Sequence, residues 1–176
     1  MVAQFARQAR AIAEAGADGI VIETMTALDE AKAALRAVRE VCDLPVVVSM
    51  TFDRGPRGFA TMMGVQPAQA AEKLTAAGAD VVGANCGAGI AQIIEVARRM
   101  RTGTSLPLWC KPNAGLPRLV GGHTIYEETP EEMVRHVADL VDAGARIIGG
   151  CCGTTPAHVR LLAAECARIA GTSTDG

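Results

Sequence analysis

Three cysteines are the residues of this sequence whose type and spacing best suit chemistry. Cys151 and Cys152 are adjacent and flanked by glycines, and Cys86 ends an earlier apolar run. Three thiolates can hold a zinc ion and leave its fourth tetrahedral position free, as in catalytic zinc sites. The chain has no CxxC or HExxH spacing, which excludes an ordinary zinc finger or a zincin. The alternative is that these cysteines are small core residues.

An internal repeat places the cysteines at the ends of strands. The segments AEAGADGIVIET, TAAGADVVGANC and VDAGARIIGGCC share one pattern. Each ends a helix at Ala-Gly-Ala, where the Gly can adopt the left-handed capping conformation, and then enters a short apolar strand. Two further strands are predicted at 45–51 and 107–111. Continuous apolar strands are typical of a parallel sheet covered on both faces.

Helical patterns separate these strands. Helices are predicted at 4–15, 27–41, 67–77, 88–101, 131–143 and 156–169. Thr129 and Glu132 form a predicted capping box with a proline at the first helical position. The order is therefore one helix followed by five βα units. The long Gly- and Pro-rich connection at 112–129 predicts either a lid over the thiols or a disordered segment.

This element order fits either an open doubly wound sheet or part of an eight-stranded barrel. The GxGxxG motif of a dinucleotide-binding sheet is absent. Sites built from several strand ends are typical of barrels. Here the strand ends carry Glu23, Asn85 with Cys86, Lys111 with Asn113, and Cys151 with Cys152. We therefore predict an α/β fold, the C-terminal portion of a TIM-type (βα)8 barrel with about five of its eight units.

Composition excludes several classes of protein. The 176 residues are 49% hydrophobic and 20% charged, which excludes intrinsic disorder and suits one folded domain. A net charge of −2 and an aromatic fraction of 3% argue against nucleic-acid binding. No apolar run approaches the length of a membrane span, and the N-terminus does not resemble a secretory signal. Six cysteines without such a signal indicate a reducing compartment, so we expect a cytoplasmic protein.

Four motifs resemble the homocysteine S-methyltransferase family. They are GANCGAG at 83–89, KPNAGLP at 111–117, YEETPEEM at 126–133 and GGCCGTTPAHV at 149–159. The last is highly specific, and the KPNAGLP form is most similar to the homocysteine-binding module of cobalamin-dependent methionine synthases. The resemblance implies a barrel in which Cys86, Cys151 and Cys152 bind zinc. It also implies methyl transfer to the thiol of homocysteine, which gives methionine.

The same resemblance implies roles for three polar residues. Glu23 would receive the amino group of homocysteine; alternatively, it is a solvated acid or the partner of a helix terminus. Asn113 would hold the fourth position of the metal when substrate is absent, or shape a turn. Asn85 precedes a ligand, so we group it with the substrate site and expect it to support that ligand or form a turn.

Residues 1–176 are thus predicted to be a homocysteine-binding domain that lacks the N-terminal strands of the family. We expect Zn²⁺ as cofactor and methylcobalamin, carried by another domain or chain, as methyl donor. Cobalamin- and folate-binding domains or chains are the expected partners, and a truncated barrel should self-associate. One alternative is a catalytically silent fragment that binds zinc or needs a complementary chain. Another is the same chemistry with betaine or S-methylmethionine as donor.

Overall fold

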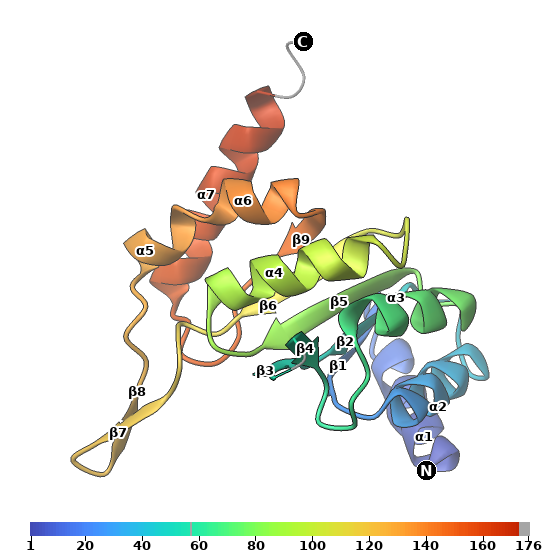
Figure 1. The fold of residues 1–176 in the computed structure, drawn as a ribbon. Helices are drawn as coiled ribbons and strands as arrows, with labels where there is room; N and C mark the ends of the chain where they lie inside the picture. Colours follow the sequence, from blue (N-terminus) through green and yellow to red (C-terminus); the bar gives the residue numbers. More distant parts are fainter. Residues whose placement is uncertain (57, 173–176) are drawn as a thin grey trace.

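A parallel five-stranded sheet forms the centre of the computed structural model, which describes residues 1–56 and 58–172 (Figure 1). Its strands follow each other across the sheet in chain order, and every neighbouring pair is parallel. They are β1 (Ile20–Met25), β2 (Val46–Met50), β5 (Val81–Cys86), β6 (Leu108–Pro112) and β9 (Ala145–Ile148). A doubly wound sheet reverses its strand order at a switch point, whereas a barrel adds each strand beside the last. The order therefore confirms the prediction of a partial βα barrel.

Helices connect the strands. They are α1 (Val2–Glu14), α2 (Leu28–Arg39), α3 (Pro67–Ala76), α4 (Ile90–Arg101), α5 (Pro130–Val134), α6 (Val137–Asp142) and α7 (Pro156–Thr172). The capping box at Thr129 is present. The single helix predicted at 131–143 is wrong, because the backbone of His136 (φ −100°, ψ 4°) leaves the helical region between α5 and α6. Within the described residues, no helix has the length and apolar character needed to cross a membrane.

The hydrophobic core lies between the helices and one face of the sheet. Successive residues of a strand point to opposite faces, so only alternate strand residues enter this core. The fully buried large side chains include Val48, Met50 and Leu108 of the strands, and Leu35, Leu74, Ile93 and Met100 of the helices. Burying one such side chain contributes about 1.5–3 kcal/mol. This layer holds the strand ends in place.

The other face of the sheet is concave. Its side chains include Val21 and Glu23 of β1 and Trp109 and Lys111 of β6, and Val21 is 42% exposed. Lys111 Nζ lies 2.9 Å from Glu23 Oε2, although β1 and β6 are three strand positions apart in the sheet. Three spacings span about 14 Å in a flat sheet. Because strand side chains stand roughly perpendicular to the sheet, the contact indicates that the sheet curls, as the wall of a barrel does.

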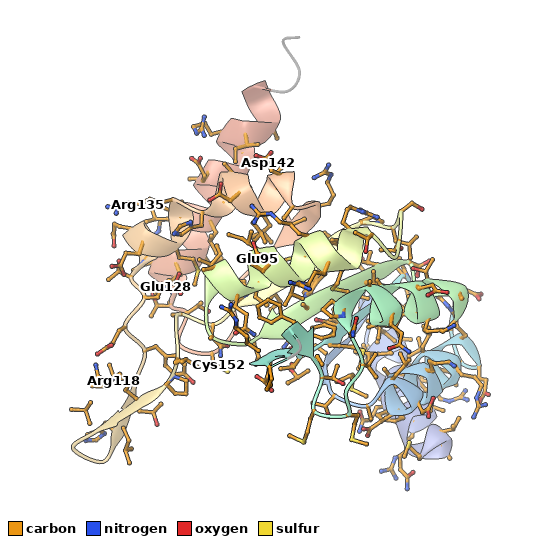
Figure 2. The ribbon with its side chains drawn as sticks, viewed as in Figure 1. Glu95, Arg118, Glu128, Arg135, Asp142 and Cys152 are labelled. Atoms are coloured by element: carbon orange, nitrogen blue, oxygen red, sulfur yellow. The ribbon has the colours of Figure 1, made fainter. Side chains whose placement is uncertain are left out.

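Two β-hairpins occupy connections that the sequence analysis left without regular structure. β3 (Asp53–Gly55) pairs with β4 (Gly58–Ala60), and β7 (Arg118–Val120) pairs with β8 (His123–Ile125). The β7–β8 hairpin projects away from the sheet, and all six of its strand residues are exposed (Figure 1). Figure 2 shows the side chain of Arg118, on this hairpin, well away from Cys152. These strands form an arm, so the prediction of a lid is wrong for them.

Candidate metal centre

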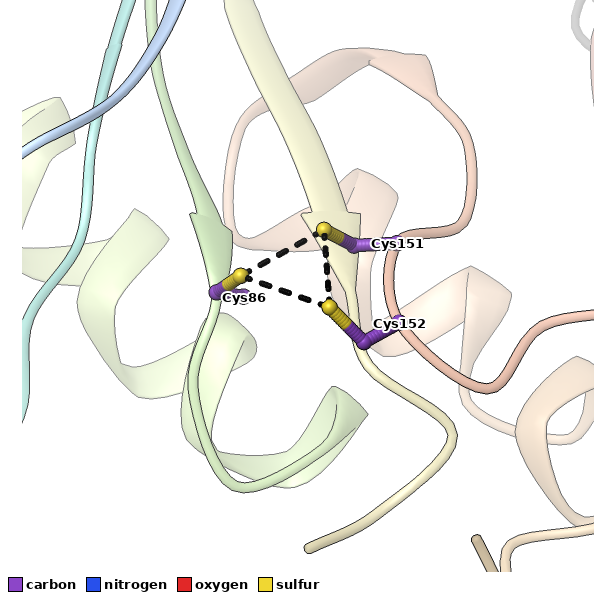
Figure 3. A group of neighbouring side chains, drawn as sticks. All are labelled: Cys86, Cys151 and Cys152. Atoms are coloured by element: carbon purple, nitrogen blue, oxygen red, sulfur yellow. Dashed lines mark hydrogen bonds between the residues drawn. The ribbon is translucent and has the colours of Figure 1, made fainter. Parts of the chain in front are cut away.

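The thiols of Cys86, Cys151 and Cys152 meet at the C-terminal end of the sheet (Figure 3). Cys86 is the last residue of β5, and the cysteine pair follows β9. The Sγ–Sγ distances are 3.4 Å for Cys86–Cys151, 3.9 Å for Cys86–Cys152 and 4.0 Å for Cys151–Cys152. A tetrahedral zinc ion with Zn–S bonds of about 2.3 Å places its sulfur ligands about 3.8 Å apart. The donor type and the spacing therefore fit zinc.

Backbone strain is concentrated beside these thiols. Thr24 (φ 63°) and Cys86 (φ 66°) are the described non-glycine residues with a left-handed backbone. This conformation costs about 1–3 kcal/mol, and it is a true outlier for a β-branched residue such as threonine. It persists only where the surroundings hold it, which is typical of functional sites.

Asn85 provides those surroundings for Thr24. Its side chain is buried, its Oδ1 accepts hydrogen bonds from the Thr24 N–H (2.9 Å) and the Ser49 hydroxyl (2.8 Å), and its Nδ2 donates to Thr24 Oγ1 (2.7 Å). Nδ2 also donates to the Sγ of Cys151 at 3.8 Å. An amide side chain offers two donors and two lone pairs, so this one is fully used. The bonding favours support of Cys151 over direct contact with substrate.

Asn113 fixes the other two ligand loops. Its Nδ2 donates to the carbonyl of Gly87 at 2.9 Å, and its Oδ1 accepts from the backbone N–H of Cys152 at 3.0 Å. The Cys151 N–H donates to the carbonyl of Pro112 at 2.8 Å, so the last residue of β6 and Asn113 directly after it hold the two cysteines of the pair. Asn113 therefore shapes the turns beside Cys86 and Cys152 through both polar atoms of its side chain.

The crowding of the thiols changes how they titrate. Burial, with the hydrogen bonds and proximity of Cys151 and Cys152, raises the pKa of Cys86 to about 12. Burial also raises the pKa of Cys151, but hydrogen bonds from Cys86, Asn85 and the Cys152 backbone outweigh it, and the net shift is downward. Deprotonation of one thiol is thus favoured, and deprotonation of a further thiol beside it is opposed. A bound divalent cation reverses this opposition.

Tyr126 is a site residue that the sequence analysis did not assign. Its ring lies on Gly153 (φ 78°), where an added Cβ would overlap the ring. Burial raises the pKa of Tyr126, and so do the neighbouring Cys152 thiol and its hydrogen bond with the tyrosine. The one available signal was the glycine directly after the cysteine pair, because it allows a large side chain to approach.

Glu128, which is labelled in Figure 2, ties the segment that carries Tyr126 to its neighbours through backbone hydrogen bonds. Its N–H donates to the carbonyl of Ala114 at 3.1 Å, and its own carbonyl lies 3.0 Å from His158 Nε2. Burial raises the pKa of the Glu128 carboxyl, while a hydrogen bond from the Ile90 N–H at the start of α4 lowers it. His158 is itself buried.

Glu23 has a partner that the sequence analysis did not foresee. Neither a helix terminus nor solvent alone faces its carboxylate, because Lys111 Nζ lies 2.9 Å from Oε2. The lysine side chain is 22% exposed and that of Glu23 is 40% exposed. Lys111 Nζ also lies 5.6 Å from the ring centroid of Trp109. The acid thus belongs to an ion pair on the concave face of the sheet.

Cysteines outside the triad are separate from it. Cys110 is buried on the helix side of β6, and burial raises the pKa of its thiol to about 12. Cys42 and Cys166 pack against the hydrophobic core. All three are free thiols, and the triad is the described cluster suited to a metal.

Comparison with known proteins agrees with the motifs. The model of the family described as homocysteine S-methyltransferase matches residues 1–166. The chain belongs to this family. The methionine synthase of Mycobacterium tuberculosis is 33% identical over 162 residues, which are 89% of this chain and 13% of the relative. The methionine synthase of Mycobacterium leprae is 31% identical over 170 residues, which are 93% of this chain and 14% of the relative.

Solved structures show the same fold for this homocysteine S-methyltransferase family member. The apo form of the homocysteine methyltransferase MmuM from Escherichia coli superposes with a TM-score of 0.73 and 24% identity, covering 93% of this chain and 57% of that one. Its metallated form gives the same TM-score and identity, with 52% of that chain covered. The chain thus spans little more than half of these structures and 13–14% of the two methionine synthases.

Proposed function

We propose that residues 1–176 form a homocysteine-binding domain that binds one Zn²⁺ through Cys86, Cys151 and Cys152 and prepares the homocysteine thiol for methylation to methionine. The observation that carries the proposal is the cluster of three Sγ atoms, 3.4–4.0 Å apart, in a member of the homocysteine S-methyltransferase family. When bound, zinc would hold the substrate sulfur as a thiolate, whereas a free thiol with a pKa near 8.5 is mostly protonated at pH 7.

The residues of the chain position the reactants. Three protein thiolates leave one tetrahedral position for the substrate sulfur. Asn85 and Asn113 hold the loops of Cys151 and Cys152 through the hydrogen bonds described above. Glu23 is proposed to accept the ammonium group of homocysteine, because its carboxylate lies on the concave face and is partly open to solvent.

Methyl transfer is a displacement at carbon. The substrate sulfur forms a bond to the methyl carbon while the bond from that carbon to the donor breaks, and the electron pair of that bond leaves with the donor. We propose methylcobalamin, carried by another domain or chain, as the donor, because KPNAGLP at 111–117 resembles methionine synthases and two relatives carry that name.

The proposed partners are the domains or chains that bind cobalamin and folate. The support for separate partners is that the chain spans only 13–14% of the two methionine synthases. We further place the protein in the cytoplasm, because its six cysteines are free thiols, as a reducing compartment maintains them.

Zinc content tests the proposal. Protein purified in reducing buffer should hold about one Zn²⁺, and Cys86→Ala, Cys151→Ala or Cys152→Ala should each lower the zinc affinity sharply. The matched controls Cys42→Ala, Cys110→Ala and Cys166→Ala should retain the ion. Equal loss in all six variants would contradict the three-ligand assignment and indicate general destabilisation instead.

A further inference from the structure

Lys111 places its ammonium group on the concave face of the sheet and is held there from three directions. Its aliphatic stem passes over Gly149, where an added Cβ would lie 3.2 Å from Lys111 Cγ. Its Nζ lies 2.9 Å from Glu23 Oε2 and 5.6 Å from the ring centroid of Trp109. A lysine side chain is seldom as buried as that of Lys111 unless its charge is paired. These contacts therefore fix the position of the Lys111 ammonium group.

The ion pair adjoins the thiols through shared residues. In the parallel register Lys111 lies beside Asn85, whose Nδ2 donates to Cys151 Sγ. Asn85 also binds the backbone N–H of Thr24, the residue after Glu23. Both charges of the pair are therefore anchored next to residues that hold the candidate metal ligands.

The concave face presents hydrogen-bond donors that lack a partner among the described residues. The ammonium group of Lys111 has three N–H donors, and one hydrogen bond to Glu23 accounts for one of them. The indole Nε1 of Trp109 is buried and has no hydrogen-bond partner among the described residues. Buried donors in native proteins are normally satisfied, so a ligand with acceptor oxygens suits this face.

We infer that Lys111 binds the α-carboxylate of the amino-acid substrate while Glu23 binds its ammonium group, an inference that rests on the proposed function. An amino acid carries both charges on one carbon atom, and the ion pair presents the two complementary charges side by side. When the substrate enters, each side chain exchanges its partner for the opposite charge of the substrate. No charge on the partly covered face is then left unpaired.

The same contact also fits an opposite role, in which the ammonium group of Lys111 occupies the place of the substrate ammonium at Glu23 and competes with substrate. The two roles predict opposite changes in homocysteine affinity when Lys111 is replaced. Removal of a carboxylate receptor weakens the binding of homocysteine, whereas removal of a competing cation strengthens it. The unpartnered donors of Lys111 and Trp109 favour the receptor role.

The test uses three thiols and the zinc-loaded full chain in isothermal titration calorimetry. L-Homocysteine carries both charges, 3-aminopropane-1-thiol lacks the carboxylate, and 4-mercaptobutanoate lacks the ammonium group. Lys111→Met should weaken homocysteine binding by about 10- to 100-fold and abolish the preference for homocysteine over 3-aminopropane-1-thiol. Lys111→Arg should keep that preference. Lys73→Met, which removes an exposed lysine of α3, should bind all three thiols as the parent chain does.

Two results would overturn the inference while leaving the proposed function intact. One is equal affinity of the parent chain for homocysteine and 3-aminopropane-1-thiol, a comparison that needs no variant. The other is unchanged or tighter homocysteine binding by Lys111→Met with zinc content retained. A zinc-loaded parent chain that binds none of the three thiols would overturn the proposed function, and the inference with it.

Discussion

Asn85 is the residue on which the contacts of the site converge. Its amide joins β1, β2 and β5 to the Sγ of Cys151, and its burial removes water as a substitute partner. Loss of a polar residue that orients a metal ligand typically lowers metal affinity 10- to 100-fold. The same residue also holds the left-handed backbone of Thr24, so one side chain both maintains this strained backbone and positions the thiol of Cys151.

Asn85→Asp tests this role. The variant keeps the shape of the side chain, removes both N–H donors and adds a negative charge beside the thiols. We expect zinc affinity to fall by about 10- to 100-fold in a competition assay with a chromophoric chelator. Gln69→Glu makes the same amide-to-acid change at an exposed position of α3 and should have no effect. Equal affinities of the two variants would contradict the supporting role.

Glu23→Gln tests the substrate carboxylate. A hydrogen bond to a charged group contributes about 1.5–3 kcal/mol, so loss of the charge should weaken homocysteine binding by about ten- to over a hundredfold. Zinc affinity should barely change, because the ion pair of Glu23 is with Lys111 and not with a cysteine. Homocysteine affinity that survives Glu23→Gln but is abolished by the cysteine substitutions would remove Glu23 from the substrate site.

Zinc binding should depend on pH through the thiols. Because the pKa of Cys86 is raised to about 12, this thiol is protonated near neutral pH without a metal. Zinc must displace that proton, so its apparent affinity should rise with pH and fall as acid is added. Calorimetry in buffers of different ionisation enthalpy should detect proton release on binding. An affinity that is flat between about pH 6.5 and 8.5 would contradict ligation by this thiol.

At this scale, sequence predicts residue types better than contacts. The three cysteines were identifiable because adjacent thiols between glycines are rare and form a specific motif. Two contacts could not be identified from the sequence, because each joins segments far apart in the chain. They are the contact of Lys111 with Glu23 and that of Tyr126 with Gly153. No local pattern encodes the curl of the sheet that brings Lys111 to Glu23.

At the scale of elements, the Ala-Gly-Ala repeat predicted three strands because a cap, an apolar run and a polar end are local features. The three-residue strands β3, β4, β7 and β8 are too short to show a periodic pattern. The break at His136 was missed for a related reason. The apolar spacing continues from α5 into α6, so the sequence alone resembles one helix.

Gly153→Ala tests the loop after β9. A Cβ there would be strained by the left-handed backbone and would overlap the ring of Tyr126. Gly16→Ala is the matched control, because Gly16 also has a left-handed backbone (φ 85°) but no atom within 4 Å of the added Cβ. We expect Gly153→Ala to lower the free energy of unfolding by about 1–3 kcal/mol more than the control. Equal denaturation midpoints would show that Tyr126 does not pack on this loop.

At the scale of the molecule, the sheet has two open edges. Among the described residues, β1 and β9 each have a neighbouring strand on one side only. A groove of about 260 Å³ runs between α1 and β1 and is lined by apolar side chains that include Phe5, Ile12 and Val21. Exposed edges with apolar surroundings promote pairing with other chains.

Sedimentation velocity tests this consequence. We expect the chain to self-associate with rising concentration, and Val21→Lys to reduce the association by placing a charge beside the β1 edge. Val159→Lys introduces the same charge at an exposed position of α7 and should leave the association unchanged. A compact monomer at every concentration would contradict association through the open edges.

Zinc K-edge X-ray absorption tests the central claim most directly, because it counts the sulfur atoms bound to the metal. The claim is that Cys86, Cys151 and Cys152 leave one zinc position for the thiol of homocysteine. The spectrum should therefore fit three sulfur ligands in the zinc-loaded chain and four after homocysteine is added. A sulfur count that stays at three with saturating homocysteine, or is already four without it, would contradict the account.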